Sequence, residues 1–174
     1  MNDKQNWISG KPLAIIVAIA ENNAIGLNNR LLWHISDDLK RFKRITEGHT
    51  VVMGKKTYES LPVRPLKNRR NIVISDSPED AFEGCLTAHS VEEAISLCDP
   101  HKMNFIIGGA SIYRQFLPLA DMLYLTRVHK AFHADTFFPE ISTKDWECIS
   151  TEQGPEDPSL GFEYTYEIYS RIYK

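Results

Sequence analysis

The stretch Phe105-Ile106-Ile107-Gly108-Gly109-Ala110-Ser111-Ile112-Tyr113 is the clearest indication of the fold class. Its first three residues are apolar and indicate a buried strand, and the glycine pair ends that strand just before a helix begins. A second stretch, Val51-Val52-Met53-Gly54-Lys55-Lys56-Thr57, repeats the order of buried strand, glycine and helix start. Because strands alternate with helices, the sequence predicts an α/β fold with a largely parallel sheet.

The rest of the chain extends this alternation in both directions. Leu13 to Ala20 is a continuous apolar run that predicts a strand buried on both faces, and Ser36 to about Glu47 is an amphipathic helix with Ser36 as its N-cap. Two terminal strands, Trp146 to Thr151 and Phe162 to Arg171, are joined by a turn-rich segment and predict an antiparallel edge. Further elements are predicted over Asn71–Ser75, Val91–Cys98, Asn104–Ile107 and Met122–Val128.

Length and composition limit the class of protein. The 174 residues, 43% of them hydrophobic, suffice for one globular domain, and we expect a single domain over residues 12–174 after a flexible extension, residues 1–11. The longest apolar run, residues 13–20, is far shorter than the roughly 20 residues of a membrane span. Three cysteines fit neither a disulfide framework nor a zinc site, so we expect a cytoplasmic protein without a metal.

The charges are unevenly distributed. Residues 30–70 carry eleven basic side chains against four acidic ones, although the whole chain has a net charge of −3. A basic region in an acidic protein favours an anionic small ligand, and solvated helix faces and turns are the alternative explanation. The basic residues are not interleaved with aromatic ones, so nucleic acid is not an expected partner.

Two of the strand-to-helix junctions have the chemistry of a phosphate site. At Gly54 and at Gly108–Gly109, glycine allows close backbone approach and a helix begins with N–H groups available, and the first junction adds two lysines. The G-x-G-x-x-G dinucleotide motif is absent, and a solvated helix start or a bare Gly–Gly turn gives the same pattern. Two such junctions on one sheet favour a dinucleotide, which would use both.

Two further segments carry candidate substrate contacts. Asp38 lies four residues before Phe42, so both share one face of the predicted helix, where a carboxylate needs a cation or a hydrogen-bond donor. The alternative is an exposed first-turn acid that stabilises the helix dipole. The turn Arg64 to Asn71 is strongly basic, and an arginine there can bind a substrate carboxylate through two parallel hydrogen bonds; a solvated loop is the alternative.

Taken in order, these segments resemble dihydrofolate reductase from about Leu13 to the C-terminus. The matching stretches are Ile16–Ala20 with Ile25–Gly26, Leu31–Lys43, Val52–Ser60, Arg64–Leu66, Arg69–Ser75, Ile107–Tyr113, Tyr124–Thr126 and Asp135–Pro139. The resemblance implies a twisted eight-stranded, mostly parallel sheet with an antiparallel C-terminal edge and about four flanking helices. It also implies reduction of dihydrofolate to tetrahydrofolate by NADPH, binding of antifolate inhibitors and a cis Gly108–Gly109 peptide bond. We further expect a monomer without membrane or nucleic-acid partners.

The resemblance gives each matching residue a role. Asp38 is the acid that binds the pterin, Trp33 holds a water near it, Thr126 backs the same network and Leu31 belongs to the catalytic set. Arg69 is expected to bind the glutamate α-carboxylate of the substrate. Substrate contacts are expected at Ile16, Val17, Ala18, Asp38, Leu39, Phe42, Leu61, Arg64, Leu66, Arg69, Ile107, Tyr113 and Thr126. Cofactor contacts are expected at Ala18, Ile25, Gly26, Asn29, Arg30, Leu31, Gly54, Lys55, Lys56, Thr57, Ile74, Ser75, Asp76, Ile107, Gly108, Gly109, Ala110, Ser111, Ile112, Tyr113 and Gln115.

Two departures from the family pattern concern the cofactor. Lys55 stands where arginine is common, and Asp76 stands where the family often has a basic or small polar residue near the adenosine 2′-phosphate. An acid there is expected to narrow the preference for NADPH over NADH, whereas Lys55 and Lys56 favour NADPH. Two other functions remain open at this point: an NADPH-dependent pyrimidine reductase of riboflavin synthesis and a non-catalytic nucleotide- or folate-binding module.

Overall fold

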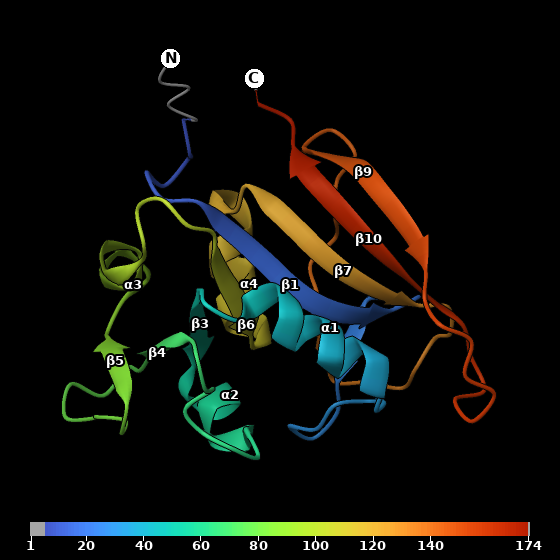
Figure 1. The fold of residues 1–174 in the computed structure, drawn as a ribbon, viewed down its shortest axis with the longest axis horizontal. Helices are drawn as coiled ribbons and strands as arrows, with labels where there is room; N and C mark the ends of the chain where they lie inside the picture. The colour runs from blue at the N-terminus through green and yellow to red at the C-terminus, as the bar shows by residue number, and fades with distance from the viewer. Residues whose placement is uncertain (1–5, 174) are drawn as a thin grey trace. The chain divides into compact units, whose positions relative to one another are not determined.

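The computed structural model describes residues 6–173, whose strands and helices alternate through most of the chain (Figure 1). The elements are β1 Leu13–Ala20, β2 Ala24–Gly26, α1 Ser36–Thr46, β3 Thr50–Gly54, α2 Lys55–Ser60, β4 Arg70–Ile74, β5 Cys85–Ala88, α3 Val91–Leu97, β6 Asn104–Gly108, α4 Ala110–Phe116, the 3-10 turn η1 Leu117–Leu119, β7 Met122–Val128, β8 Thr136–Phe137, β9 Trp146–Gln153 and β10 Tyr164–Arg171.

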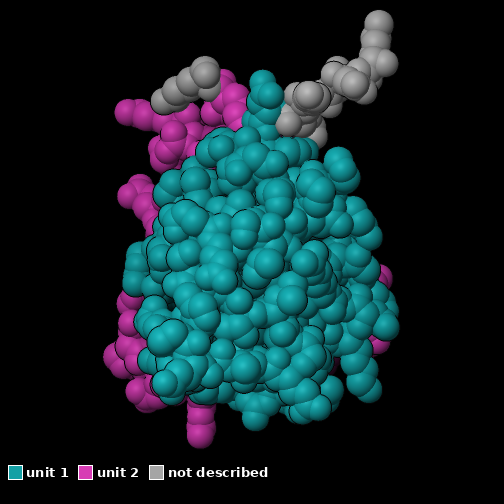
Figure 2. All heavy atoms as spheres, turned by 90° about the vertical axis from the view of Figure 1, so that its left-hand side faces the viewer, with its two compact units in different colours: residues 1–15, 46–121 teal, residues 16–45, 122–174 magenta. Residues whose placement is uncertain are grey.

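The main sheet has eight strands in the order β5-β4-β3-β6-β1-β7-β10-β9, which confirms the predicted mixed sheet with an antiparallel C-terminal edge. The four α-helices of the described chain also agree with the expected number. By its internal contacts the chain divides into two compact units, coloured in Figure 2. Unit 1 comprises the described residues up to Ile15 together with Thr46–Asp121, and unit 2 comprises Ile16–Ile45 together with the described residues from Met122 onward.

Unit 1 brings the carboxyl ends of three parallel strands to one edge of the sheet. β3 pairs in parallel with β4, with Gly54 opposite Ile74, and with β6, with Met53 opposite Gly108. The side chains of β3 from Val51 to Met53 are completely buried, as the continuous apolar run predicts for a strand covered on both faces. Because these strands run in one direction, the segments that follow Gly54, Ile74 and Gly108 all start at the same edge.

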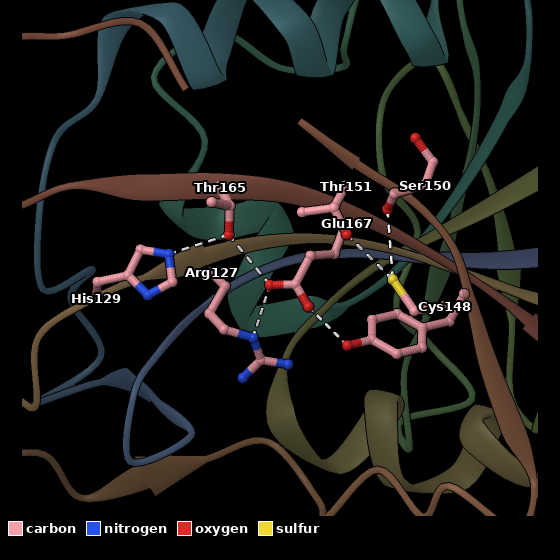
Figure 3. A network of polar contacts seen from close by, with 8 residues as sticks. Arg127, His129, Cys148, Ser150, Thr151, Thr165 and Glu167 are labelled. Carbon is pink, nitrogen blue, oxygen red and sulfur yellow. Dashed lines mark hydrogen bonds and ion pairs between the residues drawn. The ribbon is translucent and has the colours of Figure 1, made fainter. Parts of the chain in front are cut away.

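Unit 2 contains the antiparallel part of the sheet, in which β10 pairs with β7 and with β9. Side chains alternate between the two faces of β10. Tyr164 and Tyr166 are buried in an aromatic and aliphatic cluster that includes Ile35 and Val128. Glu167, the residue after Tyr166, is also buried, and a polar network of neighbouring strands surrounds it (Figure 3).

The sequence did not reveal the short strands β2, β5 and β8, which have two to four residues each. Strands of this length show no measurable alternation, and β2 and β8 form a separate two-stranded sheet. The helix α1 begins at Ser36 itself, so Ser36 is the first helical residue rather than the predicted N-cap.

The expected N-terminal extension falls partly outside the described residues, which begin at residue 6. Within the described part, Lys11 Nζ donates hydrogen bonds to the carbonyl oxygens of Ile95, Ser96 and Cys98 at 3.1, 3.3 and 2.8 Å. These carbonyls belong to the last turn of α3 and to its C-cap residue Cys98, so the Lys11 ammonium interacts favourably with the C-terminal end of the helix. No helix among residues 6–173 has the length and apolar character needed to cross a membrane.

Candidate functional site

The first part of the site lies at the carboxyl ends of β3 and β6 in unit 1. The predicted cis Gly108–Gly109 peptide bond is present. Gly108 has φ of 124°, and a Cβ on it would lie 3.2 Å from the Tyr113 hydroxyl, so both the backbone and the space require glycine. A Cβ on Gly109 would lie 3.6 Å from Thr57 Oγ1, which places the start of α4 beside the start of α2. The two predicted phosphate junctions are therefore neighbours.

The second part lies beyond the carboxyl end of the adjacent strand β4. Lys55 Nζ forms an ion pair with Asp80 Oδ2 at 3.0 Å, and Ser75 Oγ donates a hydrogen bond of 2.5 Å to the same carboxylate oxygen. These donors hold the pKa of Asp80 below its usual range, with the Ser75 hydrogen bond as the main cause and the Lys55 hydrogen bond next. Sequence reasoning missed Asp80, because a loop acid five residues beyond Ser75 carries no signal of which side chain it contacts.

The basic turn of unit 1 is anchored by its own hydrogen bonds. Arg69 donates from Nε to Thr46 Oγ1 and from Nη1 to the Lys67 carbonyl, both at 3.0 Å. Arg64 donates from Nη1 to the Glu59 carbonyl at 2.8 Å. Partial burial lowers the pKa of Arg69 from its high ordinary value, but an arginine remains charged near neutral pH. These hydrogen bonds hold Arg69 within the turn, and the nearby charge of Glu47 also acts on it.

Unit 2 contains the predicted acid. Asp38 lies in the first turn of α1 and accepts a hydrogen bond of 2.5 Å from Thr126 Oγ1 on β7. Burial raises the pKa of Asp38, against the smaller lowering effects of the Thr126 hydrogen bond and the Arg41 charge. Arg41 is held one helix turn further on, with its guanidinium carbon 4.2 Å from the centre of the Tyr166 ring. Thr126, expected in the network around the acid, contacts Asp38 directly, and the first-turn acid is not simply exposed.

The segment before α1 carries the other predicted residues of unit 2. Trp33 packs against Phe132, with ring centroids 5.1 Å apart. Asn28 and Asn29 have φ of 51° and 61°, so they form the tight turn of a small hairpin that closes between Leu27 and Arg30. An open hollow of about 550 Å³ is lined by Leu27, Asn28, Arg30, Leu31 and Leu32. The side chain of Leu31 is 79% exposed, so it is available to a ligand.

The predicted site residues divide between the two units. Unit 2 contains Ile16, Val17, Ala18, Ile25, Gly26, Asn29, Arg30, Leu31, Trp33, Asp38, Leu39, Phe42 and Thr126. Unit 1 contains Gly54, Lys55, Lys56, Thr57, Leu61, Arg64, Leu66, Arg69, Ile74, Ser75, Asp76, Gln115 and the run from Ile107 to Tyr113. Within residues 6–173, no group of three or more His, Cys, Asp or Glu side chains is arranged to hold a metal ion.

Comparison with known proteins identifies the family. The sequence model of the family described as dihydrofolate reductase matches residues 12–171. The chain belongs to the dihydrofolate reductase family.

Individual relatives agree with this assignment. The chain is 40% identical over 159 residues to dihydrofolate reductase of Bacillus subtilis (strain 168), which covers 91% of this chain and 94% of the relative. It is 45% identical over 158 residues to dihydrofolate reductase of Neisseria gonorrhoeae, covering 90% and 96% of the two chains. The structure of dihydrofolate reductase from Enterococcus faecalis complexed with NADP(H) and RAB-propyl has a TM-score of 0.86 and 39% identity over 95% of this chain and 99% of that one.

Proposed function

We propose that this chain reduces 7,8-dihydrofolate to 5,6,7,8-tetrahydrofolate by hydride transfer from NADPH. The observation that carries the proposal is the partly buried Asp38 carboxylate, which accepts a hydrogen bond from Thr126 on β7 and has a pKa above its usual range. A reductase without such an acid would lack the group that orients a pterin. The tetrahydrofolate produced would support one-carbon metabolism and the synthesis of thymidylate and purines.

The residues of unit 1 fit an NADPH pyrophosphate. Neither Gly108 nor Gly109 has a side chain to block close approach to the backbone, and at Gly108 a Cβ would lie tightly against Tyr113. Phosphate oxygens match the N–H groups of this segment, and Lys55 and Lys56 add positive charge. When bound, NADPH supplies the hydride, and the chain supplies position, exclusion of water and the acid. The further cofactor contacts proposed are those given above for Ala18, Ile25, Gly26, Asn29 to Leu31, Ile74 to Asp76 and Gln115.

Asp38 is proposed to orient the pterin. Its carboxylate accepts two hydrogen bonds, from the pterin N3–H and from the 2-amino group, and thereby fixes the position of the ring. An acid bound at that edge is not within reach of N5, so the proton for N5 arrives through water. Thr126 keeps Asp38 in place by its hydrogen bond, and Trp33 is proposed to hold the water.

The basic turn is proposed to bind the other end of the substrate. An arginine presents two parallel N–H groups to a carboxylate, and Arg69 is proposed to bind the glutamate α-carboxylate in this way. Apolar contacts to the ring and the benzoyl group are proposed at Val17, Leu31, Leu39, Phe42, Leu61, Leu66 and Ile107, and Arg64 and Tyr113 complete the substrate set.

The remaining proposals concern the context of the enzyme. We propose one catalytic domain over residues 12–174, a monomer, inhibition by diaminopyrimidine antifolates and a cytoplasmic location. All three cysteines are free thiols, which is the form that a reducing compartment maintains.

A single assay tests the proposed reaction. The purified chain is mixed with NADPH and dihydrofolate, and the absorbance of the reduced nicotinamide is followed. We expect consumption of NADPH only when both substrates are present, with a higher kcat/KM for NADPH than for NADH. Binding of both ligands without turnover would indicate a non-catalytic module, and turnover only with the pyrimidine substrate of riboflavin synthesis would indicate the other reductase.

A further inference from the structure

The ion pair of Lys55 with Asp80 occupies the place where the cofactor assignment needs a cation. Lys55 directly follows β3, and Ser75 directly follows β4, the neighbouring parallel strand. Asp80 Oδ2 accepts from both side chains, at 3.0 Å from Lys55 Nζ and at 2.5 Å from Ser75 Oγ. The cluster is only partly shielded, because the side chains of Lys55 and Asp80 remain 46% and 24% exposed.

Lys55 and Ser75 are the proposed cofactor contacts nearest the adenosine ribose, so this cluster lies on the adenosine side of the proposed site. β6 and β4 lie on opposite sides of β3. With the pyrophosphate proposed at the end of β6 and the 2′-phosphate proposed beside Lys55, the adenosine ribose would lie toward the end of β4, next to Ser75 and Asp80. A cation in this position binds a ribose 2′-phosphate, whereas a carboxylate accepts a hydrogen bond from a free 2′-hydroxyl.

Asp80 opposes a 2′-phosphate in two ways. Its negative charge repels the phosphate, and it holds the Lys55 ammonium and the Ser75 hydroxyl, which are the donors that a phosphate would use. Its pKa lies below the usual range, so it stays ionised near neutral pH. NADH has no 2′-phosphate, and therefore neither effect applies to it.

We propose that Asp80 is a specificity-determining residue that narrows the preference for NADPH over NADH by competing with the 2′-phosphate for Lys55 and Ser75. This inference rests on the proposed function, because it needs a nicotinamide dinucleotide at the edge formed by β4, β3 and β6. Asp80 is thus a second acid, beside Asp76, that is expected to narrow the preference for NADPH, and the structure shows its contact with the Lys55 ammonium. Lys56 is exposed and remains a further source of positive charge.

The test uses the full chain and ligands that need no turnover. Dissociation constants are measured by calorimetry for NADPH and NADH, and for the fragments 2′,5′-ADP and 5′-AMP, with the wild type and with Asp80→Asn and Asp80→Ala. Glu79→Gln is the matched control, since it removes an exposed negative charge from the preceding residue. Thermal unfolding of each variant verifies that it is folded.

We expect Asp80→Asn to tighten NADPH and 2′,5′-ADP by about fivefold, the factor for one like-charge contact near water. NADH and 5′-AMP should change less than twofold, and the gain should shrink at high salt. Glu79→Gln should leave the ratio of the two cofactors unchanged.

Three outcomes would overturn the proposal. Weaker NADPH binding in both Asp80 variants would mean that Asp80 positions Lys55 for the phosphate. Equal shifts for both cofactors, or no shift, would make the pair an ordinary surface ion pair. A wild type that binds neither cofactor nor fragment would overturn this proposal together with the proposed function. By contrast, a wild type that lacks dihydrofolate turnover but shows the shift in selectivity would refute only the proposed function.

Discussion

Thr126 and Arg127 are consecutive residues of β7, and each donates a hydrogen bond to a carboxylate on its own face of the strand. Thr126 Oγ1 donates to Asp38 at 2.5 Å. Arg127 Nε donates to Glu167 at 2.8 Å, as Figure 3 shows. Burial raises the pKa of both acids, but the results differ. The pKa of Asp38 stays raised, whereas hydrogen bonds from Tyr169 and Arg127 and the charge of Arg127 bring the pKa of Glu167 below its usual value.

The comparison of Asp38 with Glu167 shows that the number of protein hydrogen-bond donors, and not burial alone, distinguishes a structural carboxylate from one suited to a ligand. Glu167 accepts from Arg127, from the Tyr169 hydroxyl at 2.6 Å and from Thr165 at 3.1 Å, so its oxygens are used within the protein. A carboxylate accepts about four hydrogen bonds, and Thr126 uses one acceptor position of Asp38. The remaining capacity of Asp38 suits a ligand with two adjacent N–H donors.

The largest expected effect is on turnover in Asp38→Asn. Asparagine keeps the shape but removes the charge and replaces one acceptor with a donor, so turnover of dihydrofolate should fall roughly 10²-fold or more at neutral pH. The loss should shrink at low pH, where bulk acid protonates the substrate in advance. Steady-state kinetics over a pH series measures both effects, and NADPH affinity should barely change.

Glu167→Gln is the matched control for this experiment. It also replaces a carboxylate with an amide, but at a residue that contacts Arg127 on the other face of β7. Turnover should therefore stay within about twofold of the wild type. If the two variants lost turnover equally, or if Asp38→Asn retained wild-type turnover across the pH range, the assignment of Asp38 as the pterin acid would be wrong.

The sequence predicts the surroundings of Asp38, on one face of β7, better than those of Glu167, on the other face. Asp38 stands at helical spacing from Phe42, which places an acid on an apolar face and requires a donor there. The resemblance places Thr126 in the network around the acid, and in the structure Thr126 Oγ1 donates a hydrogen bond to Asp38. By contrast, the alternation of β10 marks Glu167 only as one of its polar residues, and nothing in the local pattern predicts that it is buried.

The unpredicted contacts share a physical cause. Glu167 meets Arg127 and Lys55 meets Asp80 across separations of 40 and 25 residues, so each depends on the register of strands or the path of a loop. Propensity and periodicity are local signals and do not fix such pairs. The glycine junctions were predictable because backbone conformation and steric room restrict the residue type at the position itself.

A second prediction compares two arginines. Arg127 donates to the Glu167 carboxylate, whereas Arg69 is the arginine proposed to bind the substrate carboxylate and is held in its turn by the Thr46 hydroxyl and the Lys67 carbonyl. Arg69→Lys should weaken dihydrofolate binding by roughly 1.5–3 kcal/mol, because a point charge replaces a two-point contact. Turnover at saturating substrate should change much less. Equilibrium binding and kcat, measured separately, distinguish these effects.

Arg127→Met is the control for the second prediction. It removes an arginine that serves Glu167, so it should lower the free energy of unfolding by about 1–2 kcal/mol without weakening dihydrofolate binding. Unaltered substrate binding in Arg69→Lys would make Arg69 a structural charge of the loop.

The smallest expected effect is on the free energy of unfolding. Its change with pH should have opposite signs for Asp38 and Glu167. A raised pKa means that the folded state binds the proton of Asp38 more tightly than the unfolded state does. The associated stability is complete below the unfolded pKa of about 4 and is lost as the pH rises through the folded pKa. For Glu167 the folded pKa is lowered, so its stability is present above the unfolded pKa and is lost as the pH falls through the folded pKa.

The variants Asp38→Asn and Glu167→Gln test these opposite pH dependences. Asp38→Asn should unfold at higher denaturant concentration than the wild type at neutral pH, by no more than about 1 kcal/mol, because the Thr126 hydrogen bond already offsets part of the cost of burying the charge. This advantage should disappear in acid, where Asp38 itself is neutral. Glu167→Gln should be less stable than the wild type at neutral pH, and the deficit should also disappear in acid. Denaturant unfolding at a series of pH values gives both curves. If Asp38→Asn were destabilised at neutral pH as much as Glu167→Gln, Asp38 would be a structural acid like Glu167, and the contrast between the two faces of β7 would not hold.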